Sequence, residues 1–143
     1  MVQKETAYRL VKKALEAREN AYAPYSRFRV GAALLAESGI VYTGCNIENA
    51  AYGPSNCAER TAFFKAVSEG ERSFLAIAIV GSGEADNGQY TAPCGVCRQV
   101  MAEFCRPEEF DVIMANMAGE YCMKTLGELL PDSFGAVNLE NGK

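Results

Sequence analysis

Two short stretches of the sequence combine side chains that could hold a metal ion and move a proton. C-A-E-R at residues 57–60 places a thiol, a carboxylate and a guanidinium within one helical turn. P-C-G-V-C-R-Q at residues 93–99 adds Cys94 and Cys97 at C-x-x-C spacing. Three thiolates can hold a zinc ion and leave its fourth position open, whereas a structural zinc is usually closed by a fourth ligand. The pattern therefore indicates a catalytic zinc site.

Two helix starts are expected to bring these thiols together. A breaker cluster at 53–56 precedes the first helix and puts Cys57 in its first turn, and Pro93 precedes the second. Cys94 and Cys97 then lie on one face at the start of that second helix. The positive end of a helix dipole favours thiolates. Arg60 and Arg98 could offset the negative charge of a three-thiolate zinc site.

Glu59 is the residue that most favours catalysis over a structural role. It follows Cys57 by two positions, so on a helix it points away from that ligand, but it can still reach a neighbouring cavity. Beside metal-bound water it could take a proton and deliver it to a leaving group. The sequence contains no histidine, which excludes a Ser-His-Asp triad and an H-E-x-x-H zinc site.

Two non-catalytic interpretations of the cysteines remain open at this point. A structural zinc site would need a fourth ligand, for which Cys122 is a candidate. The C-x-x-C pair could instead be a redox-active dithiol. Both interpretations leave Glu59 unexplained. Cys45, Cys105 and Cys122 are most simply buried thiols.

The composition predicts one globular domain spanning residues 1–143. With 49% hydrophobic residues, the chain can build a core. The net charge is −4 and no basic block is present, so nucleic acid is not an expected partner. Neither a secretory signal nor a membrane-spanning apolar run is recognisable. We therefore expect a cytoplasmic protein without a membrane partner, in which cysteines are thiols or metal ligands.

Hydrophobic periodicity along the chain predicts an α/β fold. The expected helices cover 2–20, 57–68, 95–105 and 125–130, and the expected strands cover 28–35, 40–44, 74–80, 110–115 and 121–124. This order predicts a three-layer α-β-α sandwich around a mixed five-stranded sheet. The first two strands form a hairpin, and each strand–helix–strand unit favours parallel neighbouring strands. No element is expected in the tail, 134–143.

Four motifs in this order resemble the zinc-dependent cytidine deaminases, specifically the small homotetrameric branch that acts on nucleosides. They are P-Y-S-R-F-R-V-G-A-A at 24–33, N-I-E-N-A at 46–50, the paired cysteine motifs described above, and L-L-P-D-S-F at 129–134. The resemblance covers nearly the whole chain. It implies a cytidine deaminase-like fold and one zinc ion per chain, bound by the three cysteines of residues 57, 94 and 97.

The same resemblance implies a reaction. Cytidine and 2′-deoxycytidine would be hydrolysed to uridine and 2′-deoxyuridine with release of ammonia, as in pyrimidine salvage. A zinc-bound hydroxide would attack C4 of the ring, with Glu59 as the proton shuttle and Arg60 supporting the thiolates. Asn46 and Glu48 would hydrogen-bond the 3′ hydroxyl of the pentose. Phe28 would pack on the pyrimidine, and the backbone at Ala58 would meet the base carbonyl.

Tyr52 and Phe134 are implied to act across a subunit boundary, because in the family they would complete the site of a neighbouring subunit. A homotetramer with shared sites is therefore expected. A deaminase of cytosine in RNA or DNA would carry the same zinc site. The acidic composition argues against that alternative, since a single-strand binder needs a basic groove.

Overall fold

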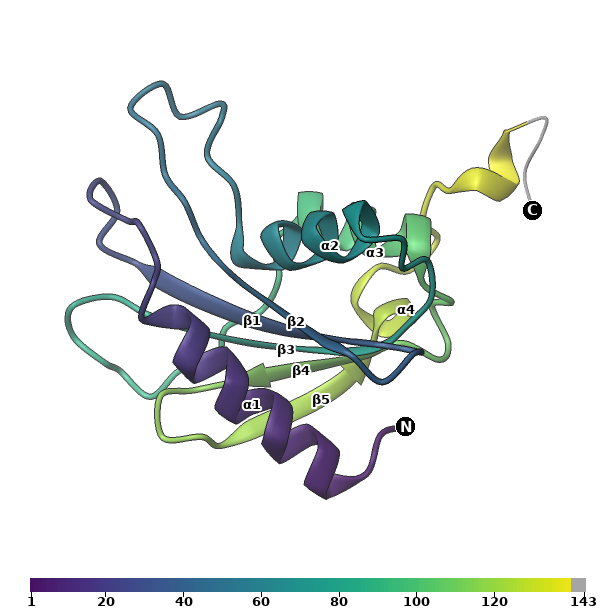
Figure 1. The fold of residues 1–143 in the computed structure, drawn as a ribbon, viewed down its shortest axis with the longest axis horizontal. Helices are drawn as coiled ribbons and strands as arrows, with labels where there is room; N and C mark the ends of the chain where they lie inside the picture. The colour runs from purple at the N-terminus through teal and green to yellow at the C-terminus, as the bar shows by residue number, and fades with distance from the viewer. Residues whose placement is uncertain (140–143) are drawn as a thin grey trace.

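The computed structural model describes residues 1–139 and shows a five-stranded sheet with helices on both faces (Figure 1). The elements are α1 (Lys4–Arg18), β1 (Arg29–Ala36), β2 (Val41–Cys45), α2 (Ala58–Ser68), β3 (Phe74–Ser82), α3 (Gly95–Phe104), β4 (Asp111–Ala115), β5 (Tyr121–Thr125), α4 (Leu126–Leu129) and a 3-10 turn at Ala136–Asn138. Their order is the predicted one, and their boundaries differ from the expected ones by at most two residues. The 3-10 turn in the tail is an addition that the sequence pattern does not indicate.

The strand order is β2-β1-β3-β4-β5. β1 is antiparallel to both β2 and β3, β3 is parallel to β4, and β4 is antiparallel to β5. The sheet is therefore mixed, as predicted. The expectation of parallel neighbours is confirmed for β3 and β4. β2 and β3 run in the same direction but are not neighbours, because β1 lies between them. β1 pairs with β3 along its whole length, from Arg29 to Ala36, and so leaves β2 at the sheet edge.

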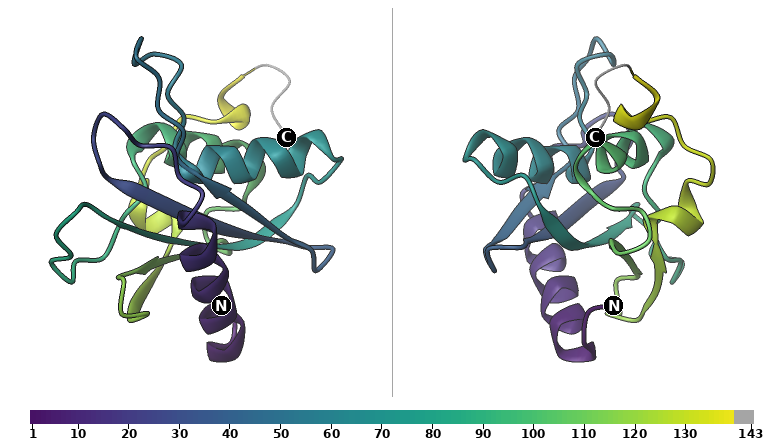
Figure 2. Two further views of the ribbon diagram at one scale, coloured as in Figure 1. Left: turned by 60° about the vertical axis from the view of Figure 1, so that its left-hand side comes forward. Right: turned by 90° about the vertical axis from the view of Figure 1, so that its right-hand side faces the viewer.

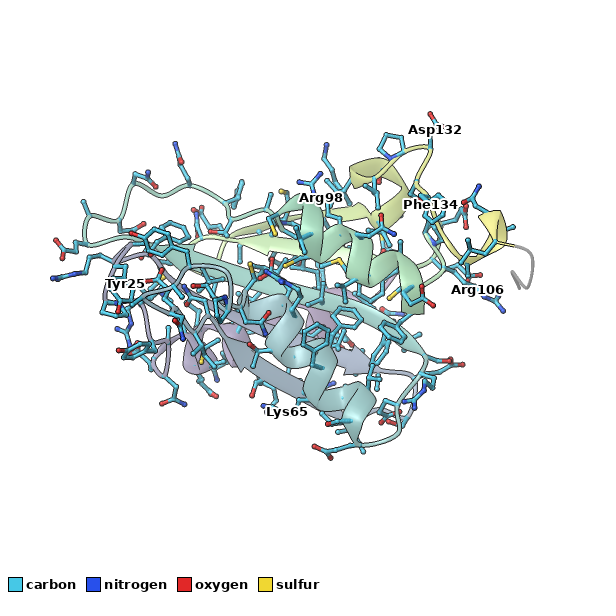
Figure 3. The ribbon with its side chains drawn as sticks, turned by 90° about the horizontal axis from the view of Figure 1, so that it is seen from above. Tyr25, Lys65, Arg98, Arg106, Asp132 and Phe134 are labelled. Atoms are coloured by element: carbon cyan, nitrogen blue, oxygen red, sulfur yellow. The ribbon has the colours of Figure 1, made fainter. Side chains whose placement is uncertain are left out.

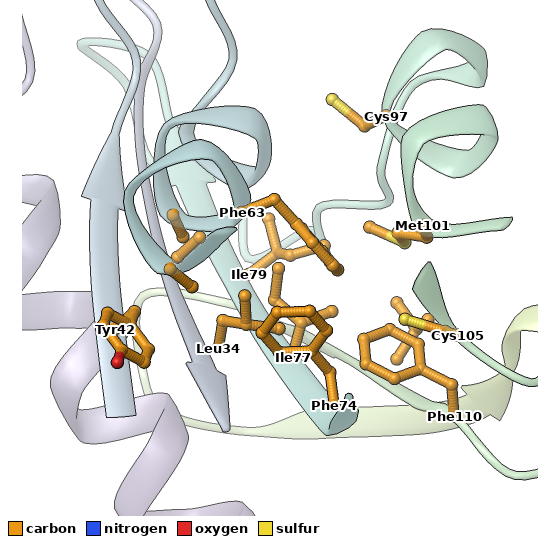
Figure 4. Close-up of a cluster of buried hydrophobic side chains, with 14 of the residues drawn as sticks. Leu34, Tyr42, Phe63, Phe74, Ile77, Ile79, Cys97, Met101, Cys105 and Phe110 are labelled. Carbon is orange, nitrogen blue, oxygen red and sulfur yellow. The ribbon is translucent and has the colours of Figure 1, made fainter. Parts of the chain in front are cut away.

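Three layers follow from the alternation of side chains along the strands, and Figure 2 shows them from two further sides. In β1, Ala32 and Leu34 face α2 and α3, whereas Ala33 and Leu35 face α1. The core on the α2 and α3 side is built largely of aromatic and large aliphatic side chains, among them Phe63, Phe74, Ile77, Ile79, Met101 and Phe110 (Figure 4). Among residues 1–139, no helix has both the length and the apolar character needed to cross a membrane.

A close approach between β2 and α2 fixes the height of the helix above the sheet. Gly44 lies under the first turns of α2, where an added Cβ would stand 2.5 Å from the Ala58 carbonyl oxygen and 2.6 Å from the Ala62 nitrogen. Only a residue without a side chain permits this contact. The edge strand therefore supports the helix start that carries Cys57 and Glu59.

Candidate active site

The three predicted metal-binding cysteines lie at the starts of two helices on the same face of the sheet. Cys57 is the N-cap of α2, and Cys94 is the N-cap of α3. Cys97 is in the first turn of α3, where its backbone N–H donates to the Cys94 sulfur at 3.5 Å. The sequence pattern predicts Cys57 inside the first turn of its helix. The structure puts it one residue earlier, in an extended conformation with φ −76° and ψ 156°.

The sulfur atoms of these cysteines form a compact triangle. The Sγ atoms of Cys57 and Cys94 are 3.8 Å apart, and those of Cys94 and Cys97 are 3.5 Å apart. Tetrahedral zinc with Zn–S bonds of about 2.3 Å requires Sγ–Sγ separations of about 3.8 Å. Within residues 1–139, this is the one cluster of three or more cysteine, histidine or acidic side chains that could hold a metal. The cluster fits one zinc ion with an open fourth position.

Cys122 does not close the site. It lies on β5 and packs against the core between the sheet and the helices α2 and α3, outside the sulfur triangle. The four-thiolate alternative that the sequence left open is therefore not supported.

The thiols of the sulfur triangle differ in acidity: the pKa of Cys57 is lowered, whereas that of Cys97 is raised. The Cys97 thiol, and then the Arg60 guanidinium, lower the pKa of Cys57 to about 5. Arg60 donates from Nη2 to the Cys57 sulfur at 3.3 Å. The hydrogen bond to Cys57 and burial raise the pKa of Cys97, because a second negative charge beside the first is unfavourable. A divalent cation would remove that conflict and allow all three thiols to ionise.

The sequence expectation that Arg98 would also offset the thiolate charge is wrong. Its Nε donates to the Pro93 carbonyl at 2.8 Å, and its Nη1 donates to the Leu129 carbonyl at 2.7 Å. The next residue, Gln99, donates from Nε2 to the Phe134 carbonyl at 2.9 Å. The start of α3 thus holds the C-terminal segment in place.

Glu59 is a buried carboxylate, with 4% of its surface exposed. It is the second residue of α2 and does not belong to the metal-binding cluster. Burial raises the pKa of Glu59 to about 7, with a further contribution from the negative charge on Cys57. A carboxyl group with that pKa can both take and return a proton near neutral pH.

One cavity of about 680 Å³ brings together most of the predicted site residues. Those that line it are Phe28, Asn46, Glu48, Tyr52, Cys57, Ala58, Glu59, Arg60 and Cys94. Cys97 is buried behind this wall, with 1% of its surface exposed. The cavity is also lined by Ser26, Thr91 and Val96, which sequence reasoning did not single out. Ser26 lies inside the first quoted motif, Val96 lies within the C-x-x-C stretch, and Thr91 precedes that stretch.

Asn46 and Glu48 hold the loop that carries Phe28. The Asn46 side chain accepts from the Val30 N–H and donates to the Phe28 carbonyl, both at 2.8 Å. Glu48 Oε1 accepts the backbone N–H groups of Tyr25 at 3.0 Å and Ser26 at 3.1 Å. The two loops lie side by side at one end of the sheet (Figure 1). These bonds fix Phe28 at the cavity, although it lies in a loop, one residue before β1 begins.

Tyr52 and Phe134 occupy different regions of the chain's surface. Tyr52 lines the cavity of its own chain and packs edge-to-face on Tyr25, with ring centroids 6.4 Å apart. Phe134 does not line that cavity, and 60% of its surface is exposed. Figure 3 shows Tyr25 and Phe134 on opposite sides of the molecule. The cavity is therefore formed without Phe134 from the same chain.

Comparisons with known proteins agree on one family. The family described as the cytidine and deoxycytidylate deaminase zinc-binding region matches residues 4–114. A cytidine deaminase of Sporosarcina psychrophila is 53% identical over 131 residues, which cover 92% of this chain and 93% of the relative. One from Halalkalibacterium halodurans is 54% identical over 132 residues, covering 92% of this chain and 96% of the relative. The crystal structure of a cytidine deaminase from Burkholderia pseudomallei superposes with a TM-score of 0.80 at 48% identity, covering 93% of this chain and 100% of that one.

The sulfur triangle predicts a defined zinc stoichiometry and a defined set of protected thiols. We expect about one zinc per chain, because three thiolates and one open position make a single tetrahedral site. Elemental analysis, combined with alkylation before and after the zinc is chelated, should show three of the six cysteines that gain reactivity when the metal is removed. Cys94→Ala should lose the zinc, since two thiolates remain.

Cys122→Ala is the matched control and should keep both the zinc and the three protected thiols. A fourth cysteine whose protection depends on the zinc, or loss of zinc in the Cys122→Ala variant, would contradict the open site.

Proposed function

The chain belongs to the cytidine and deoxycytidylate deaminase family, and we propose that Glu59 and the three clustered cysteines carry out its chemistry. It is a zinc-dependent enzyme that hydrolyses cytidine to uridine and ammonia. One observation carries the assignment of roles: Glu59, Cys57 and Cys94 line the same cavity. A general acid–base group and an open metal position are thus available to one bound molecule.

Proton transfer in this reaction falls to Glu59. Zinc held by the three thiolates supplies a Lewis acid that makes a water molecule easier to deprotonate. Glu59 takes a proton from this water and delivers it to N3 of the pyrimidine, while the oxygen of the water forms a bond to C4. It then moves the second proton of the water to the amino group, which leaves as ammonia while C4 becomes a carbonyl carbon. The raised pKa of Glu59, about 7, suits a group that must accept and donate in one cycle.

The remaining wall of the cavity would hold the nucleoside. Phe28 packs on the pyrimidine, and Ala58 donates its backbone N–H to the base carbonyl. Ala58 is the first residue of α2, so its N–H has no acceptor within the helix. Asn46 and Glu48 bind the 3′ hydroxyl, which ribose and 2′-deoxyribose share. We therefore include 2′-deoxycytidine among the substrates.

Nucleic acid does not suit this cavity as a substrate. Among the residues that line it, Arg60 is the one basic side chain, and its guanidinium is hydrogen-bonded to the Cys57 sulfur. Binding of a polynucleotide backbone requires a row of basic groups. A free nucleoside places no such demand, so a small neutral substrate is favoured.

We further propose a homotetramer whose sites are shared between subunits. The segment after α4 exposes apolar side chains, with 60% of Phe134, 74% of Val137 and 61% of Leu139 accessible. Exposure of this kind favours contact with another protein surface. Since Phe134 lies away from its own cavity, it can contact a nucleoside only in the site of another subunit.

Residues 1–143 are also proposed to act as one cytoplasmic domain. β5 pairs with β4, and Leu126 of α4 is buried in the main core, so the chain beyond residue 114 continues the same unit. All six cysteines are free. A reducing compartment keeps thiols in that state.

Glu59→Gln tests the proton transfer. Because glutamine cannot carry the proton, we expect kcat for cytidine to fall by about 10²–10⁴-fold. Zinc content should stay unchanged, since Glu59 is not a ligand. Glu103→Gln, at an exposed position of α3, is the matched control and should retain full activity. Near-normal turnover by Glu59→Gln would refute the mechanism.

Phe134→Ala tests whether sites are shared. Alone, it should weaken cytidine binding by about tenfold, as loss of an aromatic contact does. Oligomers that mix Phe134→Ala subunits with Glu59→Gln subunits should regain affinity for cytidine. In them, a site with an intact Glu59 on a Phe134→Ala subunit can receive Phe134 from a Glu59→Gln subunit. Val137→Ala, in the same exposed segment, should not alter binding. If subunit exchange is verified by mass spectrometry and no affinity returns, Phe134 does not act across subunits.

A further inference from the structure

We propose that Ser26 is a positioning residue that orients Glu48 towards the 3′ hydroxyl of the pentose and fixes Phe28 against the base. Ser26 lies in the loop between α1 and β1 and lines the cavity together with these two residues. The inference rests on the proposed function, because it assigns Glu48 to the pentose. Its support is the set of hydrogen bonds that the Ser26 hydroxyl and backbone make.

The hydrogen bonds of Glu48 determine which of its oxygens can receive a ligand. Oε1 accepts two backbone N–H groups, from Tyr25 at 3.0 Å and from Ser26 at 3.1 Å. Oε2 accepts the Ser26 hydroxyl. A carboxylate oxygen has room for about two hydrogen bonds. Oε1 is therefore filled, and Oε2 keeps one acceptor position on a residue that lines the cavity.

The same hydroxyl also restrains Phe28. A serine hydroxyl has one hydrogen to donate and lone pairs that can accept. Ser26 donates to Glu48 and accepts from the Phe28 backbone N–H at 3.0 Å. The Phe28 carbonyl in turn accepts from Asn46 at 2.8 Å. Both backbone polar groups of Phe28 are thus held by side chains at the cavity.

The residue between Ser26 and Phe28 explains why this restraint is needed. Arg27 has a φ of 60°, in the left-handed region that residues with a side chain rarely adopt. Such a conformation persists where surrounding contacts fix it. The Ser26 hydroxyl bridges across Arg27, from Glu48 to the Phe28 N–H. Without it, the loop keeps its backbone bonds to Glu48 but loses the link to Phe28.

Binding of two ligands by the zinc-loaded full-length protein isolates the contact to Glu48. Uridine and 3′-deoxyuridine carry the same base, so any disturbance of Phe28 weakens both equally. Only uridine has the hydroxyl that Glu48 would bind. In calorimetric titrations, we expect Ser26→Ala to reduce the preference for uridine over 3′-deoxyuridine by about tenfold, the effect of one charge-assisted hydrogen bond. Ser26→Thr restores a hydroxyl and should keep the preference within about threefold of the wild type.

A second serine–glutamate pair supplies the control. Ser38, in the turn between β1 and β2, donates to Glu71 Oε2 at 2.5 Å and does not line the cavity. Ser38→Ala removes the same kind of bond and should leave both affinities unchanged.

Each outcome of the titrations decides a separate claim. An unchanged ligand preference in Ser26→Ala would overturn the orientation of Glu48 by Ser26 and leave the proposed function standing. If both affinities also stay unchanged, the restraint on Phe28 is overturned as well. If the wild type binds neither ligand and does not convert cytidine, the proposed function fails, and the inference fails with it. Since Ser26 is exposed, its substitution should not disturb folding, and the unfolding midpoint of each variant checks this.

Discussion

The convergence of two helix N-termini on three thiolates is the interaction on which the rest of the structure depends. Cys57 caps α2 and Cys94 caps α3, so the partial positive charge of each helix end lies beside the sulfur atoms. This arrangement requires both helices on one face of the sheet at a fixed height. Gly44 allows α2 to approach β2, and the aromatic cluster around Phe63 fills the space beneath both helices. Packing of the core thus fixes the relative positions of the three cysteines.

The part of the cavity assigned to the nucleoside is formed by loops, and hydrogen bonds hold these loops in place. Asn46 and Glu48 hold the segment that carries Phe28 through side chain to backbone bonds. The groups assigned to the pentose are therefore also the groups that shape the wall for the base. The loop is already formed before a ligand binds. A ligand that lacks the 3′ hydroxyl should therefore bind more weakly without changing the conformation of the loop. Binding groups fixed in this way reduce the entropy cost of capturing a small substrate.

Sequence patterns were sufficient for the elements and for the metal ligands, because both depend on local spacing. The long-range pairing of β1 with β3 was not predictable, since it depends on which strand gains the central position. The donors of Arg98 go to carbonyls whose positions only the fold determines. The exclusion of Cys122 from the site likewise needed the sheet topology. The role of Ser26 could not be predicted from the sequence, because it depends on the left-handed backbone conformation of Arg27.

We propose that three thiolates with an open metal position, together with Glu59, give this chain its nucleoside deaminase activity. The most direct measurement is the ultraviolet absorbance loss when cytidine is added to purified protein, with metal content read on the same sample. We expect conversion to uridine with about one zinc per chain. A protein that holds one zinc tightly but converts neither cytidine nor 2′-deoxycytidine would contradict it.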